Sequence, residues 1–322
     1  MKRIGIYCAG GDAPGMNAAI RAVVRAAIFH ELEVTGIMRG YTGMIRGDMK
    51  TLTARDVSGI INRGGTILHT ARTPEFMTKQ GRKQAHERLK EAGIDGLVAI
   101  GGDGTFRGAY ELHKEYKIPV VGVTGTIDND CYGTDFTIGF HTAVEVALDA
   151  IDRIRDTAAS HDRIFFVETM GRHSGFLALW AGLAGGAEAI FIPEAQEDLE
   201  ATARAIMEGR RRGKTSAIVV VAEGEEAGGA FEIAEKFKSI TGLDYRVTVL
   251  GHIQRGGTPA AYDRILATRS GARAVEALLD GRKNVMVGIK DEQMVLVPFR
   301  DVWDRKKTPD LGWLEVARMM AI

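Results

Sequence analysis

The chain has 322 residues, enough for about two domains of typical size and for a large hydrophobic core. Its 42 lysines and arginines balance 42 aspartates and glutamates, which argues against a general affinity for nucleic acid or for an anionic membrane. The two cysteines, Cys8 and Cys131, have no metal-ligand spacing, so we expect no disulfide framework and a reducing, cytoplasmic setting.

Short apolar runs alternate with segments of helical periodicity along the chain. The first run stops at a glycine pair and is too short for a signal sequence, and no run approaches the length of a membrane span. We expect buried strands at 4–8, 97–100, 120–123, 164–167, 217–222 and 247–250. We expect helices at 16–29, 83–91, 143–155 and 199–211. This alternation predicts an α/β fold whose mostly parallel sheets are covered on both faces, with ligands bound in the loops after the strands.

A glycine-rich loop follows the first expected strand. Residues 9–17 read Ala-Gly-Gly-Asp-Ala-Pro-Gly-Met-Asn, with Pro14 near the helix start, where its missing N–H costs little. Glycines let the backbone approach a phosphate, and the N-terminus of a helix offers free N–H groups. The same residues would also suit a plain tight turn.

A second glycine-rich loop, Gly101-Gly102-Asp103-Gly104-Thr105, again stands between an expected strand and a helix. Its glycines make room for nucleotide phosphates, and the Asp103 carboxylate is an oxygen ligand of the kind that magnesium prefers. The spacing of the glycines differs from the dinucleotide-binding fingerprint. The loop therefore predicts phosphoryl transfer without specifying the acceptor.

A third loop, residues 124–130, is rich in polar side chains. It reads Thr-Gly-Thr-Ile-Asp-Asn-Asp and follows the expected strand at 120–123. Such a composition is common in turns. Two carboxylates this close together at the ligand end of a sheet also suit a general base and a second metal contact, and we favour that interpretation of Asp128 and Asp130.

Several arginines stand beside glycine turns, and guanidinium groups match the geometry of phosphate oxygens. They are Arg72, Arg163, Arg172, Arg246 and Arg255. Any one of them alone is more often a surface ion pair, and His252 alone is more often structural. Together they predict a cleft lined for phosphate.

These segments together resemble the bacterial ATP-dependent 6-phosphofructokinases, in order and at family spacing over essentially the whole chain. The resemblance rests on residues 10–17, 101–104, 125–130, 170–172 and 251–257. The Thr-Ile-Asp-Asn-Asp and His-Ile-Gln-Arg-Gly-Gly segments are highly specific for that family.

The resemblance implies two three-layer α/β/α domains, with the active site in the cleft between them. The larger, residues 1–138 with 251–301, would bind ATP. The smaller, residues 139–250 with 302–322, would bind fructose 6-phosphate. The resemblance also implies a homotetramer, in which one subunit completes the sugar site of its neighbour.

The chemistry implied by the resemblance is transfer of a phosphoryl group from ATP to the 1-hydroxyl of fructose 6-phosphate, a committed step of glycolysis. Asp128 would take the hydroxyl proton, with Thr126 beside it, and Asp103 would be the Mg²⁺ ligand. Arg72 and Arg172 would stabilise the charge on the transferring phosphoryl group.

The ligand contacts of the family carry over to matching positions of this chain. The ATP contacts would be Gly11, Tyr41, Arg72, Thr73, Gly102, Asp103, Gly104, Thr105 and Gly108. The sugar-phosphate contacts would be Thr126, Asp128, Asp130, Met170, Gly171, Arg172, Glu223, His252 and Arg255, with Arg163 and Arg246 reaching in from the neighbouring subunit. ATP is favoured over pyrophosphate, because Gly104 and Gly125 stand where pyrophosphate-dependent relatives usually carry aspartate and lysine, which would obstruct the nucleotide.

An effector site for ADP or phosphoenolpyruvate is implied as well. Its positions match Arg21, Arg25, Arg155, Gly186, Glu188, Arg212 and Lys214. Two positions depart from the pattern, because Ala54 stands where arginine is frequent and Gly59 where aspartate is frequent, so a response to ADP stays an open question. Met77 replaces a frequent basic residue near the ATP site, and His141 replaces an expected aspartate.

Three alternatives stay open at this point. Another kinase with a Gly-Gly-Asp-Gly-Thr turn, such as an NAD kinase or a lipid kinase, would lack the two specific segments. A pyrophosphate-dependent phosphofructokinase would not be expected to carry Gly104 and Gly125. A catalytically silent, nucleotide-sensing subunit would be expected to have lost Asp103 or Asp128.

Overall fold

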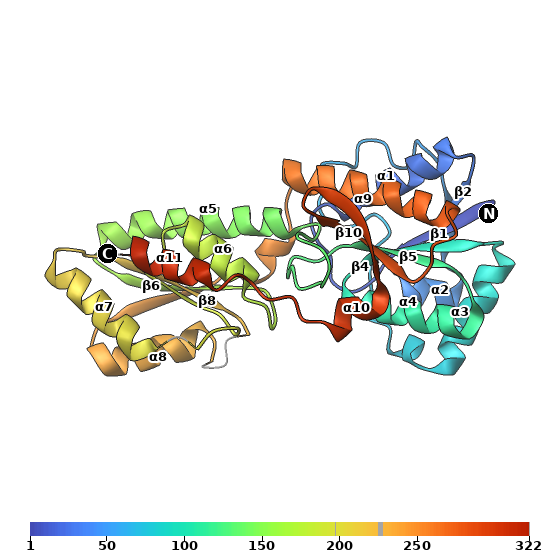
Figure 1. The fold of residues 1–322 in the computed structure, drawn as a ribbon. Helices are drawn as coiled ribbons and strands as arrows, with labels where there is room; N and C mark the ends of the chain where they lie inside the picture. Colours follow the sequence, from blue (N-terminus) through green and yellow to red (C-terminus); the bar gives the residue numbers. More distant parts are fainter. Residues whose placement is uncertain (197, 225–227, 322) are drawn as a thin grey trace. The chain divides into compact units, whose positions relative to one another are not determined.

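The computed structural model describes residues 1–196, 198–224 and 228–321, and the chain forms two compact units (Figure 1). Unit 1 comprises Met1–Ile127, Cys131–Thr142 and Arg255–Lys307. Unit 2 comprises Asp128–Asp130, Ala143–Gln254 and Thr308–Ile322. The expected boundaries after 138, 250 and 301 thus lie a few residues before the observed crossings, and the short segment Asp128–Asp130 groups with unit 2.

Unit 1 is built on a seven-stranded sheet in the order β11-β10-β5-β4-β1-β2-β3. Its strands are β1 (Arg3–Cys8), β2 (Glu33–Ile37), β3 (Met49–Leu52), β4 (Gly96–Gly101), β5 (Val120–Thr124), β10 (Val285–Lys290) and β11 (Gln293–Pro298). Neighbouring strands from β2 to β10 pair in parallel, whereas the edge strands β3 and β11 are antiparallel to their neighbours. The central strands are unbroken apolar runs because both faces of the sheet are covered.

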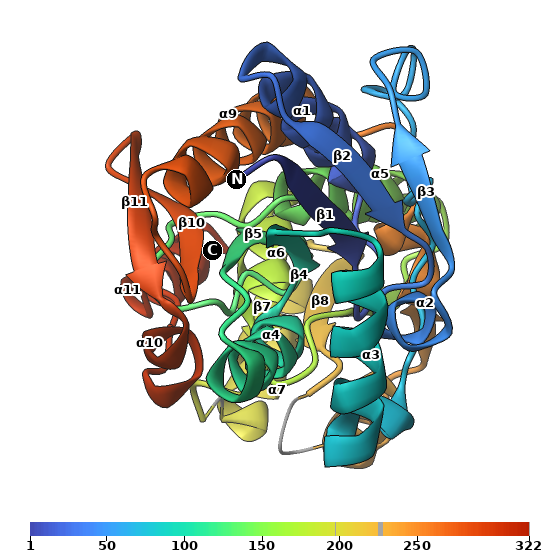
Figure 2. The same cartoon turned by 90° about the vertical axis from the view of Figure 1, so that its right-hand side faces the viewer.

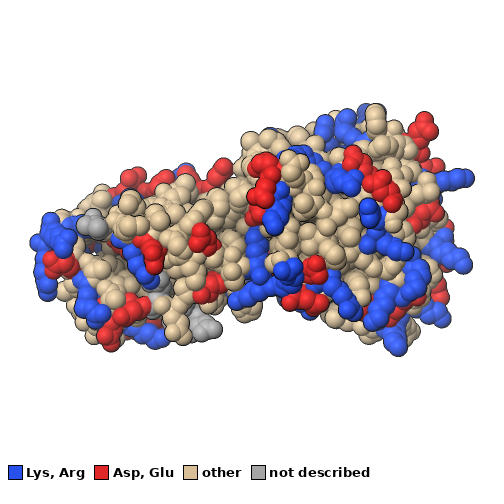
Figure 3. All heavy atoms as spheres, in the orientation of Figure 1, with Lys and Arg blue, Asp and Glu red and all other residues tan. Residues whose placement is uncertain are grey.

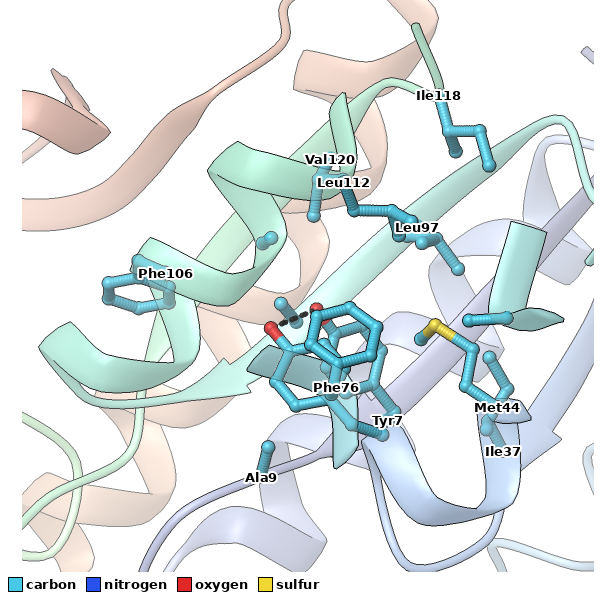
Figure 4. Close-up of a cluster of buried hydrophobic side chains, with 14 of the residues drawn as sticks. Tyr7, Ala9, Ile37, Met44, Phe76, Leu97, Phe106, Leu112, Ile118 and Val120 are labelled. Carbon is cyan, nitrogen blue, oxygen red and sulfur yellow. Dashed lines mark hydrogen bonds between the residues drawn. The ribbon is translucent and has the colours of Figure 1, made fainter. Parts of the chain in front are cut away.

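The helices of unit 1 form a layer on each face of this sheet. They are α1 (Met16–Phe29), α2 (Tyr41–Arg46), α3 (Lys79–Glu91), α4 (Asp103–Tyr116), α9 (Ala261–Leu279) and α10 (Phe299–Asp304), with a 3-10 turn η1 (Pro74–Met77). Helices α1 and α9 cover one face, and α3, α4 and α10 cover the other (Figures 1 and 2). On the second face Tyr7, Phe76, Leu97, Phe106 and Leu112 form part of one buried cluster (Figure 4).

Unit 2 contains a four-stranded parallel sheet in the order β7-β8-β6-β9. Its strands are β6 (Ile164–Thr169), β7 (Ala189–Phe191), β8 (Ala217–Ala222) and β9 (Tyr245–Val249). Its helices are α5 (Phe140–Ser160), α6 (Phe176–Ala184), α7 (Leu199–Arg211), α8 (Ala230–Thr241) and α11 (Gly312–Met320), with a 3-10 turn η2 (Gly251–Arg255). The first three residues of α5, 140–142, and the last residue of η2, Arg255, group with unit 1. Side chains of α5, α6 and α11 fill the core on one face, and those of α7 and α8 fill it on the other.

The expected elements are all present, and the two α/β/α units agree with the expected fold class. The strand expected at 247–250 begins earlier, at Tyr245, and the helix expected at 143–155 extends over Phe140–Ser160. Strands β2, β3, β7, β10 and β11 were not predicted from the sequence. Edge strand β3 has no apolar run to mark it, because Lys50 and Thr51 are exposed.

The surface matches the balanced composition. On the face drawn in Figure 3, acidic and basic side chains are interspersed over both units. Within the part of the chain that the structure describes, no helix has the length and apolar character needed to cross a membrane.

Candidate active site

Three of the loops identified in the sequence follow neighbouring strands of unit 1. Strand β4 pairs with β1 on one side and with β5 on the other, and all three run parallel. Their carboxyl ends therefore meet at one edge of the sheet. Helix α1 leads from β1 toward β2, whereas α4 leads from β4 toward β5, so the chain order reverses between β1 and β4. Ligands of open α/β sheets bind at such a switch point.

The turn after β4 is formed by close backbone contacts. A Cβ atom at Gly101 would lie 2.3 Å from Thr105 Oγ1 and 2.5 Å from the Ala9 carbonyl oxygen, so only glycine fits. Thr105 Oγ1 donates to that Ala9 oxygen at 2.9 Å and so joins the loops after β1 and β4. The backbone N–H of Gly125 donates to the Gly101 oxygen at 2.9 Å and adds the third loop. The hydroxyl of Thr105 is thus used to assemble the loops.

The start of α4 is open to a ligand. No described side chain caps this helix, so its first N–H groups suit an anion. A Cβ atom at Gly104 would meet no atom within 4 Å, which leaves the space that the preference for ATP requires. At Gly125, in contrast, a Cβ atom would lie 2.8 Å from the buried Met16 Cε, so packing already accounts for that glycine. Of the two glycines, only Gly104 therefore supports ATP by leaving space.

Asp103 is suited to hold Mg²⁺ together with phosphate oxygens. Its side chain is 42% exposed, and its carboxylate lies 3.7 Å from Arg107 Nε. Among the described residues no group of three or more potential metal ligands forms a protein cage. Magnesium commonly binds through one or two carboxylates, substrate phosphates and water, so a single exposed carboxylate at this turn fits the ion. The Arg107 guanidinium also lies 5.3 Å from the centre of the Trp303 ring.

Tyr41, expected to line the ATP, is a buried side chain of the core. Its hydroxyl donates to the Thr105 carbonyl oxygen at 2.6 Å and lies 3.1 Å from the Tyr7 hydroxyl. Burial raises the pKa of Tyr41 well above its usual value. A Cβ atom at Gly108 would lie 2.7 Å from the Tyr41 hydroxyl, and the Tyr41 ring stacks on Phe76 at 3.8 Å. Tyr41 therefore packs against α4 at Gly108 and supports the helix from the core side.

The segment that carries Arg72 and Thr73 is attached to the loop after β1. Thr70 Oγ1 donates to the Gly10 carbonyl oxygen at 2.7 Å, and the hydroxyls of Thr73 and Thr42 lie 2.7 Å apart. Arg72 is exposed, and among the described residues its guanidinium makes no hydrogen bond or ion pair. This arginine is therefore available for an anionic ligand.

Arg255, expected to contact the sugar phosphate, lies beside the loop after β1. Its Nη1 donates to the Asp12 carbonyl oxygen at 3.0 Å, and a Cβ atom at Gly11 would lie 2.6 Å from the same nitrogen. Both contacts are within unit 1, whereas the exposed His252 belongs to unit 2. The contact with Arg255 thus explains why residue 11 is a glycine.

Asp128 and Arg172 meet in unit 2. The Asp128 side chain is only 3% exposed, and its Oδ2 lies 3.6 Å from Arg172 Nε. Ser174 Oγ donates to the Asp128 carbonyl oxygen at 2.9 Å and holds the backbone of the acidic loop against the turn after β6. A buried carboxylate beside a half-exposed guanidinium suits proton transfer close to a phosphate.

The turn after β6 is held by Glu223. Strands β6 and β8 are paired with Thr169 opposite Ala222, so Glu223 follows directly on the neighbouring strand. Glu223 Oε1 accepts hydrogen bonds from the backbone N–H of Gly171 at 3.2 Å and of Arg172 at 2.7 Å. Arg172 has φ of +56°, a left-handed conformation that is strained for a residue with a side chain. The carboxylate of Glu223 thus offsets the strain that this turn carries.

The remaining residues of the expected sugar site are divided between the two units. Thr126 is buried and groups with unit 1, where its carbonyl oxygen accepts from Thr137 Oγ1 at 2.6 Å. Asp130 groups with unit 2, and Met170 is buried beside Gly171 at the end of β6.

Arg163 and Arg246 lie at the other edge of the sheet of unit 2. Arg163 directly precedes β6, and Arg246 is paired with Phe165 near the start of that strand. Six strand residues separate Arg163 from Met170, a distance of about 20 Å. The two arginines therefore do not join the site around Arg172 in the same subunit. They are on the same face of the sheet, since Arg163 and Phe165 are two residues apart.

Most of the expected effector positions cluster in unit 2. Arg155 Nη2 donates to the Gly186 carbonyl oxygen at 2.7 Å, and Glu188 Oε1 lies 4.0 Å from both Arg155 Nη1 and Lys214 Nζ. Glu188, Arg212 and Lys214 line one pocket beside α7 and α11. Arg21 and Arg25 stand on α1 in unit 1, so the expected positions are divided between the units.

Two positions that depart from the family pattern have local explanations. Gly59, where aspartate is frequent, has φ of +67°, which favours glycine. His141 packs between Phe136 and Tyr262, with ring centres 4.6 and 4.3 Å away, and burial lowers its pKa. The ring thus fills an aromatic cluster.

Sequence reasoning missed several residues that shape the site. Ser174 and Glu194 hold the turn before α6, where both Glu194 oxygens accept the Gly175 N–H at 3.0 Å. Asp263 and Thr137 hold the connection between β5 and α5. Only Ser174, which stands next to a glycine after an expected strand, had a signal in the sequence.

Comparison with known proteins gives consistent matches over the whole chain. Residues 3–278 match the protein family described as Phosphofructokinase. The chain is 59% identical to ATP-dependent 6-phosphofructokinase 1 of Thermus thermophilus, and 53% identical to ATP-dependent 6-phosphofructokinase of Shouchella clausii, over 322 residues and 100% of both chains in each case. A crystal structure of Pichia pastoris phosphofructokinase in the T-state matches 94% of this chain and 35% of its own, with TM-score 0.88 and 41% identity.

Proposed function

The chain belongs to the phosphofructokinase family, and we infer that it phosphorylates fructose 6-phosphate at the 1-hydroxyl with ATP as donor. The products are fructose 1,6-bisphosphate and ADP, and the reaction is a step of glycolysis. The inference is carried by the buried Asp128 carboxylate 3.6 Å from Arg172, in a loop that follows the strand next to the glycine turn at 101–104. The names of relatives that match over their full length agree with it.

We propose that Asp128 is the general base. As the 1-hydroxyl oxygen attacks the γ-phosphorus, its proton passes to the Asp128 carboxylate, the new P–O bond forms, and the bond to the ADP oxygen breaks. Arg172, and Arg72 from unit 1, would stabilise the charge on the transferring group. Positioning and electrostatic stabilisation supply most of the acceleration in phosphoryl transfer, so a fixed carboxylate and exposed guanidinium groups are sufficient machinery.

Unit 1 would bind ATP at the edge where β1, β4 and β5 end. The uncapped start of α4 offers backbone N–H groups to the phosphates, and Gly104 leaves space beside them. Asp103 would hold Mg²⁺, which supplies positive charge on the phosphate oxygens when bound. Thr105 and Tyr41 act indirectly here, because their hydroxyls bind the protein backbone.

Unit 2 would bind fructose 6-phosphate around the turn after β6. Arg172 and Glu223 offer charge of both signs there, Met170 and Gly171 belong to the same turn, and Asp130 and His252 stand in other loops of unit 2. Because Arg163 and Arg246 lie about 20 Å from this turn along the strand, they fit a role at the sugar phosphate of a neighbouring subunit. This division supports the homotetramer that we propose.

Regulation and location are further parts of the proposal. The cluster of Arg155, Glu188 and Lys214 would form part of a site for ADP or phosphoenolpyruvate, completed by Arg21 and Arg25 of another subunit. A cytoplasmic location follows from the glycolytic role.

A donor-swap assay tests the function. The purified protein is supplied with Mg²⁺ and fructose 6-phosphate, and fructose 1,6-bisphosphate is measured with ATP or with pyrophosphate as donor. We expect product with ATP alone. Product with pyrophosphate alone would overturn the choice of donor, and no product with either would favour a nucleotide-sensing subunit. Titrating ADP and phosphoenolpyruvate into the active reaction tests the effector site.

A further inference from the structure

A buried carboxylate on α9 fixes the start of α5. Asp263, in the first turn of α9, is 0% exposed. Its Oδ1 accepts the Gly139 backbone N–H at 2.8 Å, and its Oδ2 accepts the backbone N–H of Thr142 at 2.8 Å and the Thr142 hydroxyl. The Thr142 hydroxyl also accepts the Ala260 N–H at 2.9 Å. Because the first N–H groups of a helix have no partners within it, this carboxylate serves α5 as a cap supplied by a remote element.

The capped segment is in direct contact with the acidic loop. Ile138 forms a parallel bridge with Gly125, and Thr137 Oγ1 donates to the Thr126 carbonyl oxygen at 2.6 Å. Residues 137–139 thus lie between the Asp263 carboxylate and the stretch that leads into Asp128. A shift of Gly139 would be transmitted to Gly125 and Thr126 through these backbone contacts.

The same segment also supports the glycine loop after β1. A Cβ atom at Gly15 would lie 2.6 Å from Ile138 Cγ2 and 3.6 Å from Asp263 Cβ. A Cβ atom at Gly139 would lie 2.7 Å from Ala13 Cβ, and Gly139 has φ of +104°. Close packing without side chains leaves little room for these backbones to relax independently.

We propose that Asp263 is a positioning residue for phosphoryl transfer. By holding Gly139 and Thr142, it fixes residues 137–139, and these set the position of the loop 125–128 against the loop 9–15. Asp263 touches no substrate in this role. The proposal rests on the function inferred above, in which Asp128 is the base.

The test compares Asp263→Asn with Asp95→Asn. Asparagine keeps the shape of aspartate but turns one acceptor into a donor that faces N–H groups, so Gly139 or Thr142 loses its partner. Asp95 is the matched control, because its carboxylate also accepts two backbone N–H groups, those of Lys2 and Arg3, at the amino end of β1.

We expect Asp263→Asn to lower kcat by up to about 100-fold, as a displacement of about 1 Å can do. The KM for fructose 6-phosphate should change little, because its proposed contacts at Arg172 and Glu223 are in unit 2. Asp95→Asn should leave both constants unchanged. An Asp263→Asn variant with the kcat of the unaltered protein, or with a raised KM and normal kcat, overturns the proposal.

Hydrogen exchange measured without substrates separates this proposal from the proposed function. Amides in peptides covering 125–142 should exchange faster in Asp263→Asn than in the unaltered protein and in Asp95→Asn. If the unaltered protein has no kinase activity, the proposed function fails, whereas unchanged exchange at 125–142 overturns the role of Asp263.

Thr142 provides a milder pair of variants if Asp263→Asn does not fold. Thr142→Val removes only the hydroxyl that joins Asp263 to Ala260, and Thr142→Ser keeps it. We expect Thr142→Val to lower kcat and raise exchange at 125–142, with Thr142→Ser close to the unaltered protein. Equal values for the two variants overturn the proposal.

Discussion

The turn at 101–104 in unit 1, the glycine turn, and the turn at Gly171 and Arg172 in unit 2, the arginine turn, are held in place by different kinds of contact. The turn at 101–104 is held by backbone contacts, and its one charged side chain, Asp103, is exposed. The turn at Gly171 and Arg172 is held by a carboxylate, Glu223, and carries a strained arginine. A ligand rich in phosphate needs N–H groups and space, whereas a sugar with a reacting hydroxyl needs directed side chains.

The largest expected effect is that of replacing Asp128. It tests whether the hydroxyl proton is taken up beside the arginine turn. We expect Asp128→Asn to lower kcat by about 100- to 10,000-fold, because the hydroxyl proton loses its acceptor. Fructose 6-phosphate binding, measured by calorimetry, should be largely kept. Asp135→Asn is the control, since that acid lies in the same connection and its Oδ2 accepts the Asp291 N–H. Near-normal turnover in Asp128→Asn would remove this residue from the base role.

A glycine in the turn after β8 tests how tightly the arginine turn is packed. A Cβ atom at Gly224 would lie 1.6 Å from the Arg172 carbonyl oxygen, so Gly224→Ala must push the turn away. We expect a loss of about 1–3 kcal/mol in the free energy of unfolding and a raised KM for fructose 6-phosphate. Denaturant unfolding and steady-state kinetics measure the two effects. Unchanged values for both would show that the turn is not held at Gly224.

A partly buried ion pair between α3 and α4 tests how α4 is held away from the proposed ligand site. Glu115 on α4 accepts two hydrogen bonds from the Arg82 guanidinium, at 2.8 and 2.7 Å, and this partner lowers the pKa of Glu115. Because the folded-state pKa lies below the unfolded one, the pair stabilises fully above the unfolded pKa, and the stabilisation is lost as pH falls through the folded pKa. We expect Glu115→Gln to cost about 1 kcal/mol near neutral pH and less in acid.

Denaturant unfolding of Glu115→Gln and of the unaltered protein, at about pH 7 and about pH 3, measures this difference. Glu91→Gln is the control, because Glu91 pairs with Arg88 at an exposed site. A cost in Glu115→Gln that grows toward acid would contradict the assigned sign.

The smallest expected effect is that of Gly104→Ala, which adds a methyl group to the glycine turn as Gly224→Ala adds one beside the arginine turn. A Cβ atom at Gly104 would meet no atom within 4 Å, and the residue is in the first turn of α4. We expect Gly104→Ala to raise the free energy of unfolding by up to about 1 kcal/mol, because alanine favours the helix. A lower melting temperature in thermal unfolding would contradict this.

The glycine turn and the arginine turn also differ in how much of each could be predicted from the sequence. Glycines mark the loops after β1 and β4 because their residue type is visible in the sequence, even where the atoms that require them are distant: Gly101 meets the Ala9 carbonyl oxygen, and Gly11 meets Arg255. Those loops, the parallel sheets and the α/β/α fold were predicted and are confirmed.

Hydrogen bonds from carboxylates to distant backbone groups left no such mark in the sequence. Glu223 bonds backbone 51 and 52 residues away, and Asp263 bonds backbone more than 100 residues away. The pairing of β6 with β8 and the packing of α9 decide those contacts. At Gly125, too, a distant residue matters: Met16 packs where the side chain of the lysine found in pyrophosphate-dependent relatives would begin.

The contact of Arg107 with both Asp103 and Trp303 has an optical consequence. Indole emission responds to a nearby cation, and the guanidinium lies over the Trp303 ring. An ion or phosphate that draws Asp103 away from Arg107 would change that cation's position and so the emission. The other two tryptophans, Trp180 and Trp313, form a separate pair in unit 2 with ring centres 5.2 Å apart. With phenylalanine at those two positions, the protein would carry a single tryptophan, Trp303, whose emission reports on the glycine turn.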